Sequence, residues 1–161
     1  MKGSSGPGQH TVATNRRARH DYAIEETLEA GIVLSGAEVK SLRSGRAAIS
    51  DAFARIEGGE VWVDNLHIPP YEQASNQRSG YESKRRRKLL MHRREIDRLV
   101  GKLNERGFTL VPLRIYFVRG LAKMELGLGR GKRRFEKRHS IAEREQRREV
   151  ERALGRRRRA E

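Results

Sequence analysis

The segment Leu121–Arg138 marks the point where a body that can fold ends and a charged tail begins. In its first part apolar residues alternate with polar ones, a period of two that predicts a strand with one buried face. The pattern breaks at Gly127, Gly129 and Gly131, and a dense run of positive charge follows. The residues before this segment contain enough apolar side chains for a core, whereas those after it contain almost none. We therefore expect a folded body followed by a basic C-terminal tail.

Net charge limits the classes of partner. The 161 residues include 36 Lys and Arg against 21 Asp and Glu, a net charge of +15, and only 35% are hydrophobic. Such a balance predicts a polyanionic partner, nucleic acid first and an anionic membrane surface second. No apolar run is long enough for a membrane span or a signal peptide. The absence of cysteine excludes disulfides and thiolate metal sites and fits a cytoplasmic location.

The N-terminal third predicts a leader, a basic arm, a strand and a helix. Residues 1–14 are rich in Gly and Ser at their start, and we expect them to be disordered. The basic arm Asn15–His20 follows. The segment Tyr22–Leu34 places apolar residues on one parity and carboxylates on the other, as in a half-buried strand. A short helix is predicted to begin at Ser35 and to end at Gly45.

The middle of the chain predicts a hairpin and a basic loop. Strands are expected over Ile49–Ile56 and Val61–Ile68, with a turn at Gly58-Gly59 between them. The apolar parity changes within the second strand, which indicates a bulge or a sharp bend. Pro69-Pro70 ends that strand. A polar loop, Tyr71–Lys88, then becomes strongly basic towards its end.

A helix and a second hairpin complete the predicted body. The apolar stripe of the segment His92–Arg106 predicts an amphipathic helix with basic residues on its polar face. The strand Leu110–Val118 is followed by a tight turn, Arg119-Gly120, and by the strand that begins at Leu121. The expected inward residues are Val111, Leu113, Ile115 and Phe117, and the expected outward ones are Arg114 and Tyr116. Five strands with added helices favour a small, OB-like antiparallel β-barrel over residues 15–131, and a βαββ sheet with packed helices is the alternative.

The tail, residues 132–161, is expected to change state on binding. Glu and Arg residues three or four positions apart favour a helix, but an isolated helix of this length is marginal in water. We therefore predict a tail that is disordered when free and helical when it lies on an anion.

No catalytic motif is present in the sequence, and we expect no enzyme activity, no metal and no cofactor. Glu25 and Glu29 on one strand face are interpreted as a solvated surface or as partners of arginines, rather than as a metal-binding pair. A nuclease that uses Glu25, Glu29 or Asp51 with a metal remains an alternative, as does a general RNA chaperone. The basic clusters predict binding to RNA or DNA, and the inferred barrel favours RNA. The aromatic residues that could stack on bases are Tyr22, Tyr71, Tyr81, Tyr116 and Phe135.

Three segments carry a resemblance to a known family. They are NRRARHDYAIEETLEAGIVLSGAEVKSLRSG, KLLMHRREIDRLVGKL and GRGKRRFEKRHSIAERE, in this order along the chain. Together they resemble the SsrA-binding protein family, also called small protein B, from about Asn15 to Leu154. The resemblance implies a bacterial cytoplasmic protein with an OB-like body that binds transfer-messenger RNA (tmRNA) and takes it to ribosomes stalled without a stop codon. It also implies indirect partnership, through tmRNA, with elongation factor Tu and alanyl-tRNA synthetase.

The resemblance also implies roles for single residues. Tyr22, Glu29, Leu90 and Lys123, and the turn Arg130-Gly131-Lys132, match positions that contact the tRNA-like domain of tmRNA. Tyr22 and Leu90 are also compatible with packing in the core. The arginines of the arm that we expect to bind the same RNA are Arg16, Arg17 and Arg19.

The tail resembles the family segment that enters the decoding centre of the 30S subunit of the 70S ribosome and the empty mRNA channel. Phe135 stands where many relatives have a histidine that stacks on a base, so stacking without a hydrogen bond is expected here. Glu136-Lys137-Arg138 replaces the usual Asp-Lys-Arg.

Overall fold

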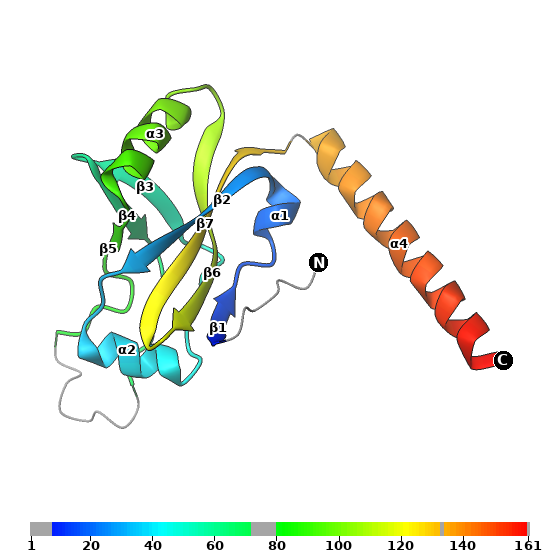
Figure 1. Ribbon diagram of the computed structural model, residues 1–161, viewed down its shortest axis with the longest axis horizontal. Helices are drawn as coiled ribbons and strands as arrows, with labels where there is room; N and C mark the ends of the chain where they lie inside the picture. The colour runs from blue at the N-terminus through cyan, green and yellow to red at the C-terminus, as the bar shows by residue number, and fades with distance from the viewer. Residues whose placement is uncertain (1–7, 72–79, 133, 161) are drawn as a thin grey trace.

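The computed structural model describes residues 8–71, 80–132 and 134–160. Its strands form one antiparallel sheet in the order β1-β6-β3-β4-β5-β2-β7, and β7 also pairs with β6, so the sheet closes into a barrel (Figure 1). The closed barrel with helices around it confirms the predicted OB-like fold class. The strands are β1 (Gln9–Thr14), β2 (Tyr22–Ile32), β3 (Phe53–Glu57), β4 (Glu60–Asp64), β5 (Arg87–Leu90), β6 (Phe108–Val118) and β7 (Leu121–Gly131). The helices are α1 (Ala18–Asp21), α2 (Gly36–Arg43), α3 (Arg93–Leu103) and α4 (Arg134–Ala160).

Strand β7 continues through the glycines that were expected to end it. It pairs with β6 on one side and with β2 on the other, as far as Gly131. A Cβ atom on Gly129 would overlap the carbonyl oxygen of Ala23 in β2, so only glycine allows the two backbones to approach this closely. The predicted break is therefore wrong, and the body extends to the end of β7.

Bulges divide the apolar residues of the long strands between two clusters. The pairing of β6 with β7 shifts between Pro112 and Arg114. Ile115 and Phe117, beyond the shift, pack in the main core inside the barrel. The small second cluster contains Ala18, Val111 and Leu113, against which Tyr22 and Ile24 pack. The strict alternation predicted for this strand therefore fails at the bulge, although all four residues that were expected to face inwards are buried.

Strand β1 lies within the segment that was expected to be a disordered leader. It pairs with the second half of β6, with Thr11 opposite Tyr116. Val12 and Ala13 pack against the main core. The sequence of β1 has few apolar residues, so its order comes from an edge of β6 that no other strand covers there. Gln9–Thr14 are thus part of the folded body, and a boundary after residue 14 does not match the structure.

The middle of the chain bends after β4, as predicted, and its basic loop ends in a strand that was not predicted. β4 ends at Asp64, and Asn65 adopts a left-handed conformation with φ of 56°, which reorients the chain so that Leu66 and Ile68 are both buried. The end of the predicted basic loop is the short strand β5, which pairs with β4 and β2. Helix α3 buries Ile96 and Leu99 against the barrel, in agreement with the predicted stripe.

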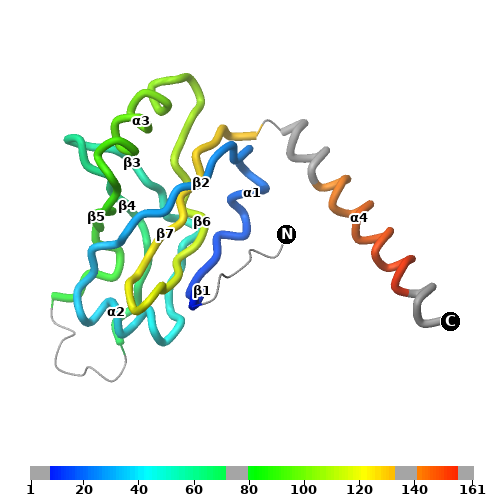
Figure 2. The backbone as a smooth tube through the Cα atoms, viewed as in Figure 1, coloured from blue at the N-terminus to red at the C-terminus, as the bar shows by residue number. Residues whose placement is uncertain are grey.

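Helix α4 leaves the body beside α1. The backbone N–H of Lys132 donates a hydrogen bond of 2.8 Å to the carbonyl oxygen of Asp21, which fixes the end of β7 next to α1. From there α4 extends away from the barrel (Figure 2). The described side chains of α4, residues 141–155, are exposed. The expected disorder of the free tail stays a prediction.

Candidate nucleic-acid interface

Alternate residues of three paired strands form a polar patch on the outside of the barrel. The pairing places Glu29 opposite Glu125, Arg114 opposite Glu125, and Tyr116 opposite Lys123. Because side chains alternate across a strand and the neighbours of these residues point into the core, all five point outwards. We call these five residues, on β2, β6 and β7, the outer patch.

Internal contacts order the outer patch. The hydroxyl group of Tyr116 donates a hydrogen bond to Glu29, and the ammonium group of Lys123 lies 4.0 Å from the other carboxylate oxygen of Glu29. Arg114 forms an ion pair with Glu125 and lies over the Tyr116 ring, 4.4 Å from its centroid. Burial and the hydrogen bond to Glu29 raise the pKa of Tyr116, so its hydroxyl group stays protonated and donates.

Leu90 lies in the same depression as two outer-patch residues. The depression is lined by Glu29, Gly31, Leu90, Met91, His92, Glu95 and Lys123. Leu90 is opposite Gly31 in the β2–β5 pairing, and its side chain is 54% exposed. This exposure excludes the alternative that Leu90 packs in the core. The structure thus brings Glu29, Leu90 and Lys123 together from three different strands.

The remaining predicted residues of the body meet at the other end of β7. Tyr22 is opposite Gly131 in the β2–β7 pairing and packs in the second cluster while keeping part of its surface exposed. Arg130 is exposed and lies over the Phe108 ring, 4.3 Å from its centroid. The basic arm leads directly into this region. Its arginines Arg16, Arg17 and Arg19 are all exposed.

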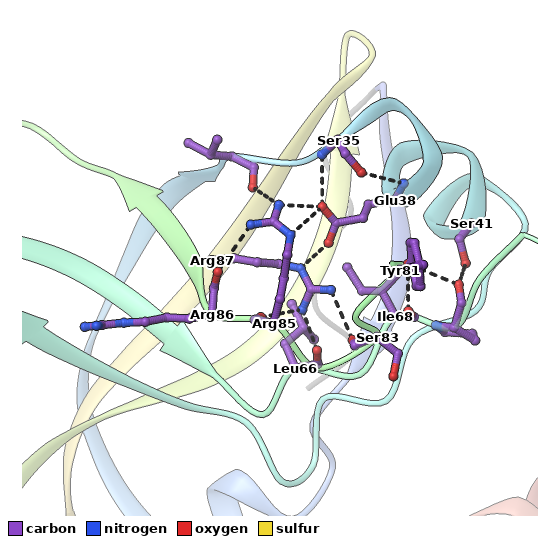
Figure 3. Close-up of polar contacts among 12 residues, drawn as sticks. Ser35, Glu38, Ser41, Leu66, Ile68, Tyr81, Ser83, Arg85, Arg86 and Arg87 are labelled. Carbon is purple, nitrogen blue, oxygen red and sulfur yellow. Dashed lines mark hydrogen bonds and ion pairs between the residues drawn. The ribbon is translucent and has the colours of Figure 1, made fainter. Parts of the chain in front are cut away.

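The basic loop before β5 does not present the free positive charge that its sequence suggests. Glu38, on α2, is 1% exposed and accepts hydrogen bonds from Arg85 at 2.5 and 3.0 Å and from Arg87, which is fully buried (Figure 3). Burial acts to raise the pKa of Glu38, but hydrogen bonds from Arg85, the Ser35 N–H and Arg87 outweigh it and lower that pKa. Arg86 pairs with Glu57 at 2.7 Å. This part of the chain stabilises the fold. The expectation of a basic cluster open to RNA is wrong for Arg87, which is buried, while Arg85 and Arg86 are partly exposed and held in ion pairs.

The polar face of α3 is also partly neutralised within the body. Arg98 binds Glu26 through two hydrogen bonds of 2.5 and 2.8 Å, and Arg93 donates to the carbonyl oxygen of Gly59 at 2.7 Å. The arm, by contrast, presents three exposed arginines, and Arg130 is exposed at the end of β7.

The sequence matches the model of a known protein family. The family model for SmpB protein matches residues 12–156, nearly the whole chain. The chain belongs to the SmpB family.

Curated SmpB-family relatives match over almost their full length under the name SsrA-binding protein. The one from Thermobifida fusca is 57% identical over 98% of this chain and 97% of its own. The one from Acidothermus cellulolyticus is 58% identical over 93% of each chain. A solved structure described as "tmRNA-SmpB: a journey to the center of the bacterial ribosome" is 52% identical, with a TM-score of 0.63 over 80% of this chain and 93% of that one.

Some residues expected to act on the ribosome lie where only the backbone is described. Phe135, Glu136, Lys137 and Arg138 belong to the first turns of α4, and their side chains fall outside the described residues. Their roles stay predictions.

The sequence did not predict how the outer patch is supported. Tyr116 was one of the aromatic residues that could stack on a base, but it is only 2% exposed and holds Glu29 instead. Counting back from the Arg119-Gly120 turn pairs Tyr116 with Lys123, so this contact between strands was available from the sequence. The approach of Glu29 was not, because β2 lies almost ninety residues away along the chain.

Two kinds of feature are absent from the part of the chain that the structure describes, namely metal-ligand clusters and membrane-spanning helices. No group of three or more His, Cys, Asp or Glu residues lies together there as metal ligands would. Among the same residues, no helix has the length and apolar character needed to cross a bilayer.

Proposed function

We propose that this chain is an RNA-binding adaptor of bacterial ribosome rescue. Its body binds the tRNA-like domain of tmRNA and delivers tmRNA to stalled ribosomes for trans-translation and peptide tagging. The observation that supports this most directly is the convergence of Glu29, Leu90 and Lys123 on one depression, in a chain of the SmpB family. The pairing of Gly31 with Leu90 on one side and with Lys123 on the other places the three residues, each matched by resemblance, on one surface where a single ligand can contact them all.

The chemistry of the depression suits structured RNA. The ammonium group of Lys123 provides a phosphate ligand, and Leu90 offers an exposed apolar surface for a base or ribose face. Glu29 is half exposed and keeps acceptor capacity beyond its contacts with Tyr116 and Lys123, for a base edge or a ribose hydroxyl group. The phosphate contacts give affinity, and Glu29 gives selectivity.

The basic arm and the end of β7 extend the RNA contact. Arg16, Arg17 and Arg19, together with Arg130-Gly131-Lys132, bind the phosphate backbone of the same domain. Beyond them, α4 enters the decoding centre and the empty mRNA channel, where Phe135 stacks on a base and Glu136-Lys137-Arg138 positions the start of the helix. The body then comprises the barrel through Gly131, and the tail begins at Lys132.

The adaptor performs no catalysis and needs no metal or cofactor. It acts in the cytoplasm, where its partners are tmRNA and the 30S subunit of the 70S ribosome. Elongation factor Tu and alanyl-tRNA synthetase are engaged indirectly, through tmRNA.

A binding titration at near-physiological salt tests the proposal. The full chain is titrated with the tRNA-like domain of tmRNA, with an ordinary tRNA and with a DNA duplex. We expect clear preference for the tRNA-like domain, and loss of that preference for Glu29→Ala and Lys123→Ala. Equal binding to all three nucleic acids, weakening together as salt rises, would mean that only charge is recognised, as in a general RNA chaperone.

A further inference from the structure

A glycine near the end of β2 forms the floor of the depression at Leu90. Gly31 is paired on both sides, with Leu90 of β5 and with Lys123 of β7. Its neighbours Ala30 and Ile32 are buried in the main core, so a side chain at residue 31 would point outwards, into the depression that Gly31 lines. The floor between Leu90 and Lys123 is therefore bare backbone.

The fold does not require a glycine at this position. The φ angle of Gly31 lies outside the left-handed region, and a Cβ atom there would meet only Leu90, at ordinary contact distances of 3.4 to 3.9 Å. Gly129 differs, because its Cβ atom would lie 2.3 Å from the carbonyl oxygen of Ala23. The pairing of β2 with β7 is regular at residue 31, so no bulge accounts for the glycine either.

A glycine that packing does not explain has another common cause. Glycine weakens a strand, because it loses more conformational freedom on folding than any other residue and has no side chain to pack. Apart from bulges and close backbone contacts, glycines in strands mark places where a ligand approaches the backbone closely. Gly31 lies at such a place, on the floor of an open depression.

The walls of the depression have the size and chemistry for one nucleoside. Two strand spacings separate Leu90 from Lys123, about 10 Å, which leaves room for a single flat ring system over Gly31. Leu90 is 54% exposed and offers apolar contact at one edge of such a ring. At the other edge Lys123 can donate hydrogen bonds and Glu29 can accept them. Unstacked bases, with free faces and edges, are the usual targets of sequence-specific RNA recognition.

We propose that one unstacked base of the bound tRNA-like domain lies directly on the backbone of Gly31. The face of the base contacts the peptide groups of Gly31, one edge contacts Leu90, and the polar edge reaches Lys123 and Glu29. Residue 31 then determines specificity, because any side chain there would lift the base off the floor and away from both walls. The inference rests on the proposed function and identifies the part of the RNA that the depression receives.

Gly31→Ala tests the inference, because the fold can accept the added methyl group whereas the base cannot. Affinity of the full chain for the tRNA-like domain, titrated at near-physiological salt, should fall about tenfold, since overfilling a packed contact is costly. The melting temperature should stay the same or rise, because alanine loses less backbone entropy on folding than glycine does. RNA affinity equal to that of the unmodified chain would overturn the inference.

Gly101→Ala is the matched control. Gly101 lies on α3, outside the lining of the depression, and a Cβ atom there would have no heavy atom within 4 Å beyond its own helix. The substitution should raise the melting temperature and leave RNA affinity unchanged. An equal loss of RNA affinity in both variants would show that the depression is not the cause, and would reject the site.

A double substitution separates contact with the base from displacement of Leu90. Because the added methyl group meets only Leu90 within the protein, Gly31→Ala is measured in the unmodified chain and in the Leu90→Ala background. A further loss of affinity in the Leu90→Ala background is expected, since the methyl group displaces the base itself. No further loss there would mean that Gly31→Ala acts through Leu90 alone, and would overturn the inference.

Single abasic sites in the loops of the tRNA-like domain locate the base. At one position the abasic site should weaken binding of the unmodified chain but not of Gly31→Ala, because that variant has already lost the contact. If no position behaves in this way, no base lies on Gly31.

Failure of the inference is distinct from failure of the proposed function. If Gly31→Ala binds normally while Glu29→Ala and Lys123→Ala lose the preference for the tRNA-like domain, the proposed function stands and the assignment of Gly31 fails. If all three variants keep the preference of the unmodified chain, the depression is not the RNA site and both fail.

Discussion

The hydroxyl group of Tyr116 on β6 binds the carboxylate of Glu29 on β2 by reaching across β7, the strand that lies between them. Tyr116 is 2% exposed, whereas the side chain of Glu29 is 50% exposed. The inner oxygen of the carboxylate is therefore held by the protein while its outer side remains open. A carboxylate fixed in this way loses less conformational entropy when it binds a ligand.

Tyr116→Phe should weaken binding of the tRNA-like domain while leaving the fold intact. The substitution removes one hydrogen bond to a charged group, and Glu29 is then ordered only by Lys123. We expect affinity to fall about three- to tenfold, measured by titration at near-physiological salt.

Tyr81→Phe is the matched control for this change. It removes a tyrosine hydroxyl group that donates to the carbonyl oxygen of Ile68 at 2.8 Å, and it does not touch Glu29. Its RNA affinity should equal that of the unmodified chain. If Tyr116→Phe also binds RNA normally, Tyr116 has no part in ordering Glu29 for RNA.

Structural features that depend on neighbours along the chain were predicted from the sequence, whereas contacts between residues far apart in the chain were missed. The Arg119-Gly120 hairpin and the stripe of α3 depend on neighbours along the chain, and both were predicted correctly. Burial of Arg87 depends on Glu38, forty-nine residues earlier, so a run of arginines was interpreted as a free surface. Strand β1 depends on an open edge of β6 and has no strong pattern of its own. Bulges, as at Pro112, are likewise set by closure of the barrel.

Glu38→Gln should destabilise the body strongly. The substitution removes the negative charge that neutralises Arg87, whose side chain is fully buried, and an unpaired buried charge costs about 3–5 kcal/mol of the free energy of unfolding. Urea denaturation measures the loss. Glu26→Gln, which breaks the exposed pair with Arg98, is the control and should cost about 1 kcal/mol or less.

The pH dependence of stability gives an independent check on Glu38. Its pKa is lower in the folded state than the ordinary value of 4.5, so the unfolded state takes up the proton first as pH falls. The stabilisation is fully present above about pH 4.5 and is lost below it, as pH approaches the folded pKa. Glu38→Gln should show a shallower loss of stability in this acid range, and an unchanged slope would contradict the assignment.

Gly129→Ala should destabilise the barrel, and Gly131→Ala should not. A Cβ atom at residue 129 would overlap the backbone of Ala23, whereas one at residue 131 has no heavy atom within 4 Å. Forcing β2 and β7 apart should cost about 3 kcal/mol of the free energy of unfolding. Thermal unfolding of the two variants measures the difference, and equal melting temperatures would show that the strands separate there without cost.

Two pairs of arginine substitutions separate cations that are available to RNA from cations that the fold uses. Arg16 and Arg19 are exposed in the arm, whereas Arg93 and Arg98 are engaged by Gly59 and Glu26. Replacing the first pair by alanine should reduce the slope of log affinity against log salt by about 1.5, because two phosphate contacts are lost. Replacing the second pair should leave the slope almost unchanged. An unchanged slope for the arm pair would mean that the arm makes no phosphate contact.

Removal of the tail separates RNA binding from action on the ribosome. The cut belongs after Lys132 rather than after Arg130, because Gly131 still pairs with Tyr22 and the Lys132 N–H still binds Asp21. The truncated chain should bind the tRNA-like domain within about tenfold of the full chain, since the tail adds mainly salt-dependent affinity. Tagging of peptides on stalled ribosomes should be lost.

In the full chain, Phe135→Ala should impair engagement of the ribosome more than Phe135→His does, because histidine keeps a ring that stacks. Normal tagging by the truncated chain would show that the body alone suffices, and equal activity of the Phe135 variants would show that stacking at this position is not used.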